Sequence, residues 1–194
     1  GGSTNLRTDD LYDFAGQTYN FFMEGFGFDS WDGQGSEMLS VLLANNNCPN
    51  AYWNGQTTNY CPGFALDDVV AHEWGHAYTE KTHGLIYQWQ SGALNEAYSD
   101  MWGETIDLYN GVDGIVAPPY TNDNSKPFNL LDPTDSGVRW LLGEELTVAG
   151  VEALLRDMWD PERAGDPAKV ISTNYHCATS DNGGVHSNSG VPNH

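Results

Sequence analysis

Two histidines and a glutamate stand close together in the segment His72-Glu73-Trp74-Gly75-His76. Residues four apart on a helix share a face, so His72 and His76 can bind one metal ion through their imidazole rings. Glu73 lies between them and is a candidate general base. This spacing is typical of sites where zinc and a glutamate activate water for hydrolysis.

A second segment, Asn95 to Asp100, reads NEAYSD and begins about twenty residues later. Glu96 and Asp100 are also four apart, so a second helix can offer Glu96 to the metal and Asp100 to the back of an imidazole. Zinc-bound histidines usually donate their other N–H group to such a partner. Two imidazoles and one carboxylate leave a fourth zinc position open for water. An ordinary exposed helix explains the first segment alone, but not both segments together.

Four helices and two short strands are expected around these residues. Thr8 or Asp9 can begin a helix that runs to about Gly25. Strand-like pieces follow around Val41 and Tyr52. A second helix is expected from Asp67 or Asp68 to Gly84, and a third from Ser91 to Gly111. A long loop or insertion over 110–138 follows, and then a helix near Val151–Met158.

The chain has 194 residues, a net charge of −20 and only seven lysines and arginines. Nucleic-acid binding needs a basic surface, so this composition argues against it. No apolar run approaches the length of a membrane helix. The acidic balance suits high solubility, a saline habitat or bound calcium, and the charge alone does not choose among these.

Three cysteines indicate an oxidising, extracellular setting, and therefore a secreted protein. Cys48 and Cys61 flank the segment 50–55, and their separation suits a disulfide across a hairpin. Cys177 is left over, either free or paired with a cysteine outside this sequence. No Cys-x-x-Cys spacing is present, so the cysteines are not expected to bind zinc.

The run from Asp68 to Asp100 resembles the catalytic core of the thermolysin family of zinc metalloendopeptidases. Further blocks in the family's order are DNGGVHSNSG (181–190), NAYWNG (50–55), and Leu155-Arg156 with Gly165-Asp166-Pro167 downstream. The resemblance implies one catalytic zinc on His72, His76 and Glu96, and a peptide or protein substrate.

The resemblance also implies catalytic and supporting roles. Tyr87 and His186 would donate hydrogen bonds to the developing oxyanion, and Asp181 would orient His186. The alternatives are a core tyrosine and a turn histidine. Asp100 would stand behind His72, and Asn95 behind His76. Three other histidines are expected at the surface: His83, His176 and His194.

Substrate contacts follow from the same resemblance. Asn50, Ala51 and Trp53 would form an edge that pairs with substrate backbone. Arg156 would grip a substrate carbonyl, the alternative being a surface salt bridge. The main specificity pocket would be lined by four apolar residues and would accept Leu, Phe or Ile just after the scissile bond. These residues are Val69, Leu142, Leu146 and Leu155.

Calcium is where the chain departs from the family. Asp68, Asp107 and Glu144 match three acidic ligands of a paired calcium site. Arg139 and Leu141 stand where further oxygen ligands are expected, and calcium needs six to eight oxygens. We therefore expect one calcium or none. Asp113 or Asp135 would help to bind it, or Arg139 would replace an ion by pairing with a carboxylate.

The expected fold class is α+β and mainly helical, a zincin-like core with a zinc helix, a glutamate helix and a small antiparallel β edge. The chain divides into an N-terminal helix and β edge (1–66), a zinc-binding helix pair (67–109), the insertion (110–138) and the start of a C-terminal lobe (139–194). We expect it to lack the family's N-terminal β part and C-terminal helical lobe, which a second chain or missing segment would complete.

Two other functions remain open from the sequence. One is a zinc-stabilised inactive or binding module derived from such a peptidase, and the other is a zinc hydrolase of a different bond, such as an ester. The intact set Glu73, Tyr87, Asp181 and His186 argues against the first. The blocks around Asn50 and Arg156 argue against the second, because they serve a peptide backbone.

Overall fold

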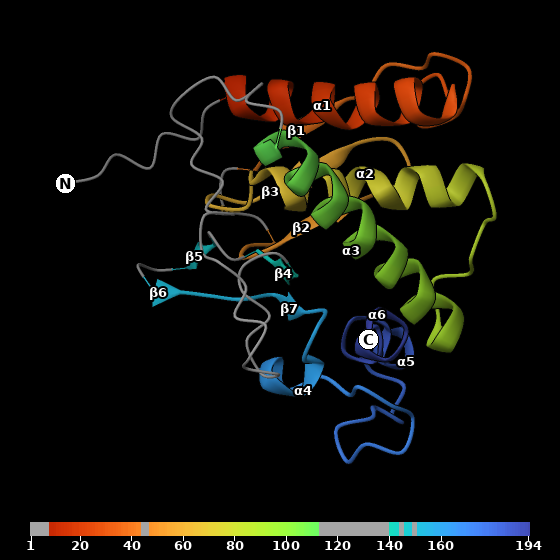
Figure 1. Cartoon of the computed structure of the whole chain (residues 1–194), viewed down its shortest axis with the longest axis vertical. Helices are drawn as coiled ribbons and strands as arrows, with labels where there is room; N and C mark the ends of the chain where they lie inside the picture. The colour runs from red at the N-terminus through yellow and green to blue at the C-terminus, as the bar shows by residue number, and fades with distance from the viewer. Residues whose placement is uncertain (1–7, 44–46, 113–139, 144–145, 149–150) are drawn as a thin grey trace.

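The computed structural model describes residues 8–43, 47–112, 140–143, 146–148 and 151–194. In this part of the chain, long helices pack beside small sheets, and the C-terminal segment returns to lie near the start of α3 (Figure 1). The mainly helical α+β class expected from the sequence is confirmed. None of the helices in the described ranges has the length and apolar character that a membrane crossing demands.

Helix α1 (Thr8–Phe26) covers the core and matches the expected N-terminal helix. Its buried residues Leu11, Phe14 and Phe22 recur at helical spacing and face α2 (Asp67–Lys81). The ring of Phe22 stacks on Tyr78 with the centroids 3.7 Å apart. One buried cluster runs from α1 through α2 into α3 (Trp89–Val112), so the zinc-helix candidate lies inside the core.

A three-stranded sheet stands beside α2, with strands β1 (Ser40–Leu42), β2 (Ala51–Trp53) and β3 (Thr58–Tyr60). Its order is β1-β3-β2; β1 runs parallel to β3, and β2 runs antiparallel to β3 with Ala51 opposite Tyr60. The expected pieces near Val41 and Tyr52 are β1 and β2. In the described part of the chain β2 is one of the two edge strands, with β3 in the centre.

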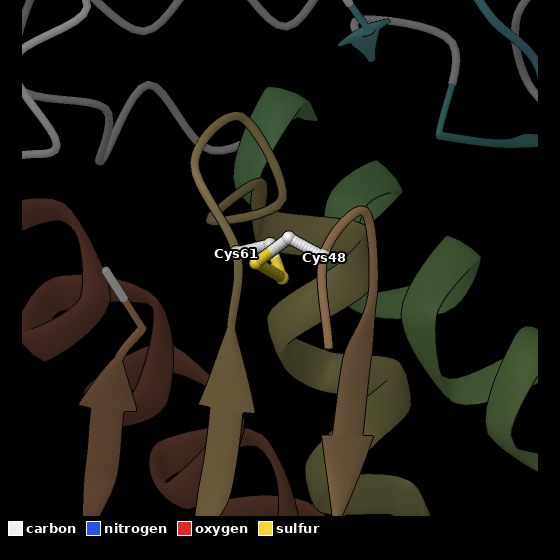
Figure 2. The surroundings of a disulfide bond; sticks show 2 residues. All are labelled: Cys48 and Cys61. Atoms are coloured by element: carbon white, nitrogen blue, oxygen red, sulfur yellow. A yellow bond between two sulfur atoms is a disulfide. The ribbon is translucent and has the colours of Figure 1, made fainter. Parts of the chain in front are cut away.

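The predicted disulfide joins Cys48 to Cys61, with the sulfurs 1.98 Å apart. Figure 2 shows the bond linking the approach to β2 with the end of β3. The backbone N–H of Cys61 also donates to the Asn50 carbonyl at 2.9 Å. The disulfide therefore fixes the strand expected to contact substrate. Cys177 is a free, exposed cysteine.

Helices α2 and α3 pack closely because Gly75 has no side chain at their contact. A β-carbon at Gly75 would lie 3.1 Å from the Ser99 Cα and Oγ atoms. The interior therefore receives polar residues of both helices, including His72, Glu73, Glu96 and Asp100, all buried. Helix α3 begins two residues before Ser91 and continues through Gly111, slightly longer than expected.

The C-terminal half contains short strands and short helices. Strand β4 (Leu141–Leu142) pairs with β7 (Arg156–Asp157), and β5 (Thr147–Val148) pairs with β6 (Val151–Glu152). Helices α4 (Pro161–Ala164), α5 (Asp181–Asn188) and α6 (Gly190–Asn193) follow.

The prediction of a helix near Val151–Met158 is wrong, because strands β6 and β7 occupy this segment. Its apolar residues suit a helix, but its backbone groups pair with strands earlier in the chain, and such tertiary pairing overrides local propensity. Most of the expected insertion, from residue 113 to residue 138, lies outside the described residues.

Candidate metal centre and cleft

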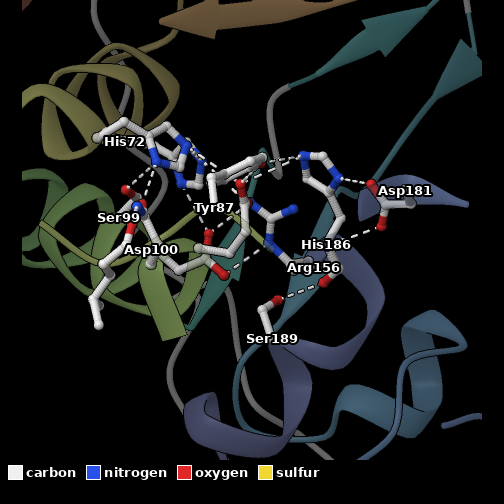
Figure 3. Close-up of polar contacts among 12 residues, drawn as sticks. His72, Tyr87, Ser99, Asp100, Arg156, Asp181, His186 and Ser189 are labelled. Atoms are coloured by element: carbon white, nitrogen blue, oxygen red, sulfur yellow. Dashed lines mark hydrogen bonds and ion pairs between the residues drawn. The ribbon is translucent and has the colours of Figure 1, made fainter. Parts of the chain in front are cut away.

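Helices α2 and α3 bring the three expected ligands together (Figure 3). The Nε2 atoms of His72 and His76 lie 3.1 Å apart. Glu96 places one carboxylate oxygen 3.5 Å from His72 Nε2 and the other 3.3 Å from His76 Nε2. Tetrahedral ligands about 2.0–2.1 Å from zinc would lie roughly 3.3 Å from one another. The observed spacings therefore fit a zinc ion.

The partners behind the histidines decide which ring nitrogens face the site. His72 Nδ1 lies 2.9 Å from Asp100 Oδ1, and His76 Nδ1 lies 2.7 Å from Asn95 Oδ1. Both acceptors favour a proton on Nδ1, so the Nε2 atoms, which face the Glu96 carboxylate, are the nitrogens that a metal would bind in place of a proton. Three electron-rich groups facing one another within hydrogen-bond distance are a donor set suited to a cation.

Burial and charge act in opposite directions at these groups. Burial opposes protonation of His72, but Asp100 and Glu96 outweigh it and raise the His72 pKa to about 10. Burial alone would raise the Glu96 pKa, whereas His76, His72 and Arg156 hold it well below its usual value. Glu96 is therefore an anion at neutral pH and can act as a ligand.

Asp100 receives more contacts than the sequence suggested. Arg156 donates to it from Nε and Nη2 at 2.7 and 2.6 Å, and Asn193 Nδ2 donates at 2.8 Å. Arg156 Nη2 also lies 3.2 Å from Glu96 Oε2. Burial opposes ionisation of Asp100, yet Arg156 and His72 lower its pKa to about 2. Arg156 is buried, so the alternative of a surface salt bridge is wrong.

A cleft of about 750 Å³ opens over the metal-ligand set. Glu73 lines it together with His72 and His76, as a general base must. Burial raises the Glu73 pKa, and the two histidines oppose that shift. The remaining lining residues are Asn50, Ala51, Tyr52, Trp53, Asn54, Gly55, Glu80, Gly84, Leu85, Tyr87, Asn95 and His186.

Tyr87 and His186 face each other at the cleft, 3.1 Å between the Tyr87 hydroxyl oxygen and His186 Nε2. The Tyr87 hydroxyl donates to Glu96, and burial together with Glu96 raises the Tyr87 pKa. Asp181 accepts from His186 Nδ1 at 2.5 Å and from the His186 backbone N–H at 3.0 Å. Figure 3 shows the carboxylate on the far side of the ring from Tyr87. The two alternative interpretations, a core tyrosine and a turn histidine, do not explain this contact between Tyr87 and His186.

Only some of the expected substrate residues line the cleft. Asn50, Ala51 and Trp53 do so, and Trp53 Nε1 donates to Glu80 at 3.0 Å. Arg156 does not, nor do the four apolar pocket candidates. Val69, Leu142 and Leu146 are buried, and Leu155 packs against the clusters that contain Val69 and Leu146.

The calcium candidates are only partly described. Asp68 is buried at the start of α2, where Val69 and Gly143 donate backbone N–H groups to its carboxylate. Burial and then Asp67 raise the Asp68 pKa to about 7. Gly103 lies against the Asp68 carbonyl, one turn before Asp107. Four other candidates lie outside the described residues: Asp113, Asp135, Arg139 and Glu144.

Sequence reasoning missed several residues at or beside the site. Ser99 Oγ lies 3.1 Å from His76 Nδ1, and its position four residues after Asn95 could have indicated it. Ser189 donates to the His186 carbonyl at 2.6 Å. Glu104 is a buried carboxylate between Asp100 and Asp107 on α3. The contact of Asn193 with Asp100 carries no local signal, since 93 residues separate them.

Family models match nearly the whole chain. Residues 5–80 match the thermolysin metallopeptidase catalytic domain, and residues 83–194 match the thermolysin metallopeptidase alpha-helical domain.

Comparison with individual proteins gives the same result as the family models. The chain is 35% identical to an extracellular metalloprotease of Pectobacterium carotovorum subsp. carotovorum over 97% of its length and 53% of that protein. It is 36% identical to an extracellular elastase of Staphylococcus epidermidis, over 93% of this chain and 32% of the relative. A solved precursor of protealysin, a metalloproteinase from Serratia proteamaculans, superposes with a TM-score of 0.71 at 32% identity. That comparison covers 100% of this chain and 59% of the other. The chain thus spans about a third to a little over half of these proteins.

Proposed function

The chain belongs to the thermolysin family of metallopeptidases, and from that premise we propose that its cleft hydrolyses internal peptide bonds with the help of one zinc ion. The observation that carries this proposal is the joint placement of two groups of residues. His72, His76 and Glu96 form a compact metal-ligand set, and Glu73, Tyr87 and His186 line the cleft above it.

Zinc bound by His72, His76 and Glu96 would supply Lewis acidity toward water and the scissile carbonyl. Glu73 accepts the proton of the attacking water and passes it to the leaving amine nitrogen. The raised pKa of Glu73 favours this shuttle, because a more basic carboxylate accepts the proton more readily. Asp100 and Asn95 hold the histidines in the tautomer that directs Nε2 toward the metal.

Tyr87 and His186 donate hydrogen bonds to the carbonyl oxygen as negative charge develops on it. The raised pKa of Tyr87 keeps its hydroxyl protonated at neutral pH. His186 donates from Nε2 only when the ring carries both protons, and Asp181 supplies the opposite charge at Nδ1. These two donors come from different parts of the chain, Tyr87 from the segment between α2 and α3 and His186 from α5.

Substrate backbone would pair with β2, an edge strand of the described sheet, and with the residue before it, through Asn50, Ala51 and Trp53. We propose cleavage on the N-terminal side of bulky apolar residues. The apolar character of Val69, Leu142, Leu146 and Leu155 supports this preference, although they belong to the core next to the site rather than to the cleft wall. The proposed grip of Arg156 on a substrate carbonyl is compatible with its position beside Glu96.

Secretion is a further part of the proposal. The Cys48–Cys61 disulfide supports it, because disulfides persist in oxidising compartments. Relatives that are named extracellular support it as well. One calcium or none at Asp68 and Asp107, with Glu144, remains the proposed second cofactor.

Hydrolysis of casein tests the proposed function. The zinc-loaded protein should cleave casein, a zinc chelator should stop the cleavage, and added zinc should restore it. Glu73→Gln should abolish cleavage while zinc remains bound, because Glu73 is a base and not a ligand. Sequencing of the products should find Leu, Phe or Ile at the new N-termini.

The competing function, a zinc-stabilised binding module, predicts a different result. Such a module would bind zinc with the same stoichiometry in the wild-type and Glu73→Gln proteins and would hydrolyse nothing. Intact casein after prolonged incubation with the zinc-loaded protein would therefore favour the module over the peptidase.

A further inference from the structure

Trp89, the first residue of α3, has a backbone conformation that is rare for a large side chain. Its φ angle is +53°, in the left-handed region that glycine, asparagine and aspartate tolerate best. Strain of this kind persists only where the surrounding structure imposes it, and it often occurs at functional sites. The packing around Trp89 must therefore impose this conformation.

The indole ring of Trp89 packs directly on Gly183. A β-carbon at Gly183 would lie 2.4 Å from Cδ2 and Cε3 of the ring, so only glycine allows this approach. Gly183 belongs to an unusual turn in which four successive residues, 181–184, have positive φ angles of 52°, 49°, 92° and 79°. This turn carries Asp181 at its start and leads directly to His186.

The next residue of the turn, Gly184, packs against the segment around His176. A β-carbon at Gly184 would lie 2.6 Å from the His176 β-carbon. The Asn188 side chain accepts from the His176 backbone N–H and donates to its carbonyl, both at 2.9 Å. His176 is thus partly buried. The turn is therefore in close contact with two groups, the His176 segment at Gly184 and the Trp89 ring at Gly183.

Trp89 also ends the loop that carries Tyr87. The left-handed residue lies two positions after Tyr87, and the backbone closes around it through Gly92 N–H to the Gln88 carbonyl at 3.0 Å. Trp89 is therefore linked to both residues of the Tyr87–His186 pair. It follows Tyr87 by two positions in the chain, and it contacts Gly183, three positions before His186. The rings of Tyr87 and His186 have centroids 6.2 Å apart.

We propose that Trp89 is a positioning residue that sets the spacing between Tyr87 and His186 by holding its ring against Gly183. Its kinetic consequence rests on the proposed function, because the two residues act together only if they share a developing oxyanion. The spacing itself is a property of the chain and can be measured without turnover.

Trp89→Asn removes the ring while suiting the positive φ angle. The melting temperature should stay the same or rise as strain is relieved, and zinc affinity should not change. The kcat for a peptide substrate should fall roughly 10–100-fold, since misplacement by about 1 Å can cost that much, while KM stays within about twofold. Trp89→Phe keeps a ring and should retain a kcat near that of the wild type.

Trp159→Asn is the matched control, because Trp159 is 44% exposed and Trp89 is 41% exposed. It removes an indole of equal exposure that packs elsewhere and should leave kcat unchanged. If Trp89→Asn folds poorly, Trp89→Gly serves as the second ring-free variant. Loss of zinc by both variants would overturn the proposal, because the ring would then be needed for the fold as a whole.

Nuclear Overhauser effects between the rings of Tyr87 and His186 give a readout independent of activity. They should be present in the wild-type and Trp89→Phe proteins and lost in Trp89→Asn. If the wild type does not hydrolyse peptides, the proposed function fails, but this measurement still decides the positioning role. Unchanged Overhauser effects in the ring-free variants, or a loss expressed in KM alone, would refute it.

Discussion

Arg156 and Asp100 form a buried ion pair with two hydrogen bonds, 2.7 Å from Nε to Oδ2 and 2.6 Å from Nη2 to Oδ1. The same aspartate stands 2.9 Å behind the ligand His72. The sequence assigned these residues separate tasks, one toward substrate and one toward a histidine. Their contact means that a change at Arg156 alters the electrostatics of the metal-ligand set whether or not substrate is bound.

Arg156→Met should destabilise the protein by roughly 3–5 kcal/mol, because it leaves the Asp100 carboxylate buried without its cation. Arg156→Lys should cost less, since it keeps the charge but loses the two-bond geometry. Urea unfolding of the three proteins, all treated with a zinc chelator, measures both effects. Equal stability of the Met variant and the wild type would mean that Asn193 and His72 suffice to hold Asp100.

His186→Ala should lower kcat by roughly 10²–10³, the usual loss for one oxyanion donor, with zinc binding unchanged. His186 is 53% exposed, so its removal should disturb the fold little. Asp181→Asn should give a smaller loss, because it removes the charge that holds the ring but not the ring itself. Steady-state kinetics on one peptide, with zinc content measured in parallel, checks both. A His186→Ala enzyme with full kcat would remove His186 from the mechanism.

The Cys48–Cys61 disulfide should stabilise the protein by about 3 kcal/mol in the chain-entropy model. The double variant Cys48→Ala/Cys61→Ala tests this by denaturant unfolding against the wild type. Thiol titration of the denatured wild type should find only Cys177. The same double change should weaken substrate binding, since β2 lies at the cleft; an unchanged KM would show that β3 alone holds the strand.

The clustering of His72, His76 and Glu96 could be predicted in part because its information is local. His72 with His76, and Glu96 with Asp100, are each four residues apart on one helix, so the spacing alone places them on shared faces. The pairing of the two helices depends on Gly75 against Ser99, and the resemblance to a known family carried that step.

What could not be predicted depends on contacts between distant segments. Arg156 reaches Asp100 across 56 residues and Asn193 reaches it across 93, and neither position shows a periodic pattern. The segment near Val151–Met158 was expected to be helical, because its apolar spacing does not reveal that strands before it satisfy its backbone. The positive φ angle of Trp89 was also not predicted, because a bulky residue adopts it only when its packing requires it, here the packing of the ring on Gly183.

Calcium should bind with a stoichiometry of no more than one, and a bound ion should raise the melting temperature. Asp68, Glu104 and Asp107 are buried carboxylates, and one ion at a free concentration one hundred times its Kd contributes about 2.7 kcal/mol. That corresponds to roughly 5–10 °C for a domain of this size. Thermal melts with calcium and with a calcium-selective chelator, at constant zinc, measure the shift, and Asp107→Asn should abolish it. A titration that finds two ions would contradict the expectation based on Arg139 and Leu141.

Asp166 should make stability depend on pH in a way that an amide would not. Burial raises the Asp166 pKa to about 6, and Arg156 only partly opposes the shift. The unfolded chain should titrate near the ordinary value of about 3.9, so the folded state binds more protons between about pH 4 and pH 6. Stability from this group is therefore greatest below pH 4, falls as pH rises through the folded pKa, and stays low above about pH 6.

Asp166→Asn removes that fall, so the variant should gain stability relative to the wild type as pH rises from 4 to 7. Urea unfolding at several pH values gives the difference between the two proteins, in which the titration of every other group cancels. A difference that does not change with pH would show that Asp166 titrates alike in the folded and unfolded chains.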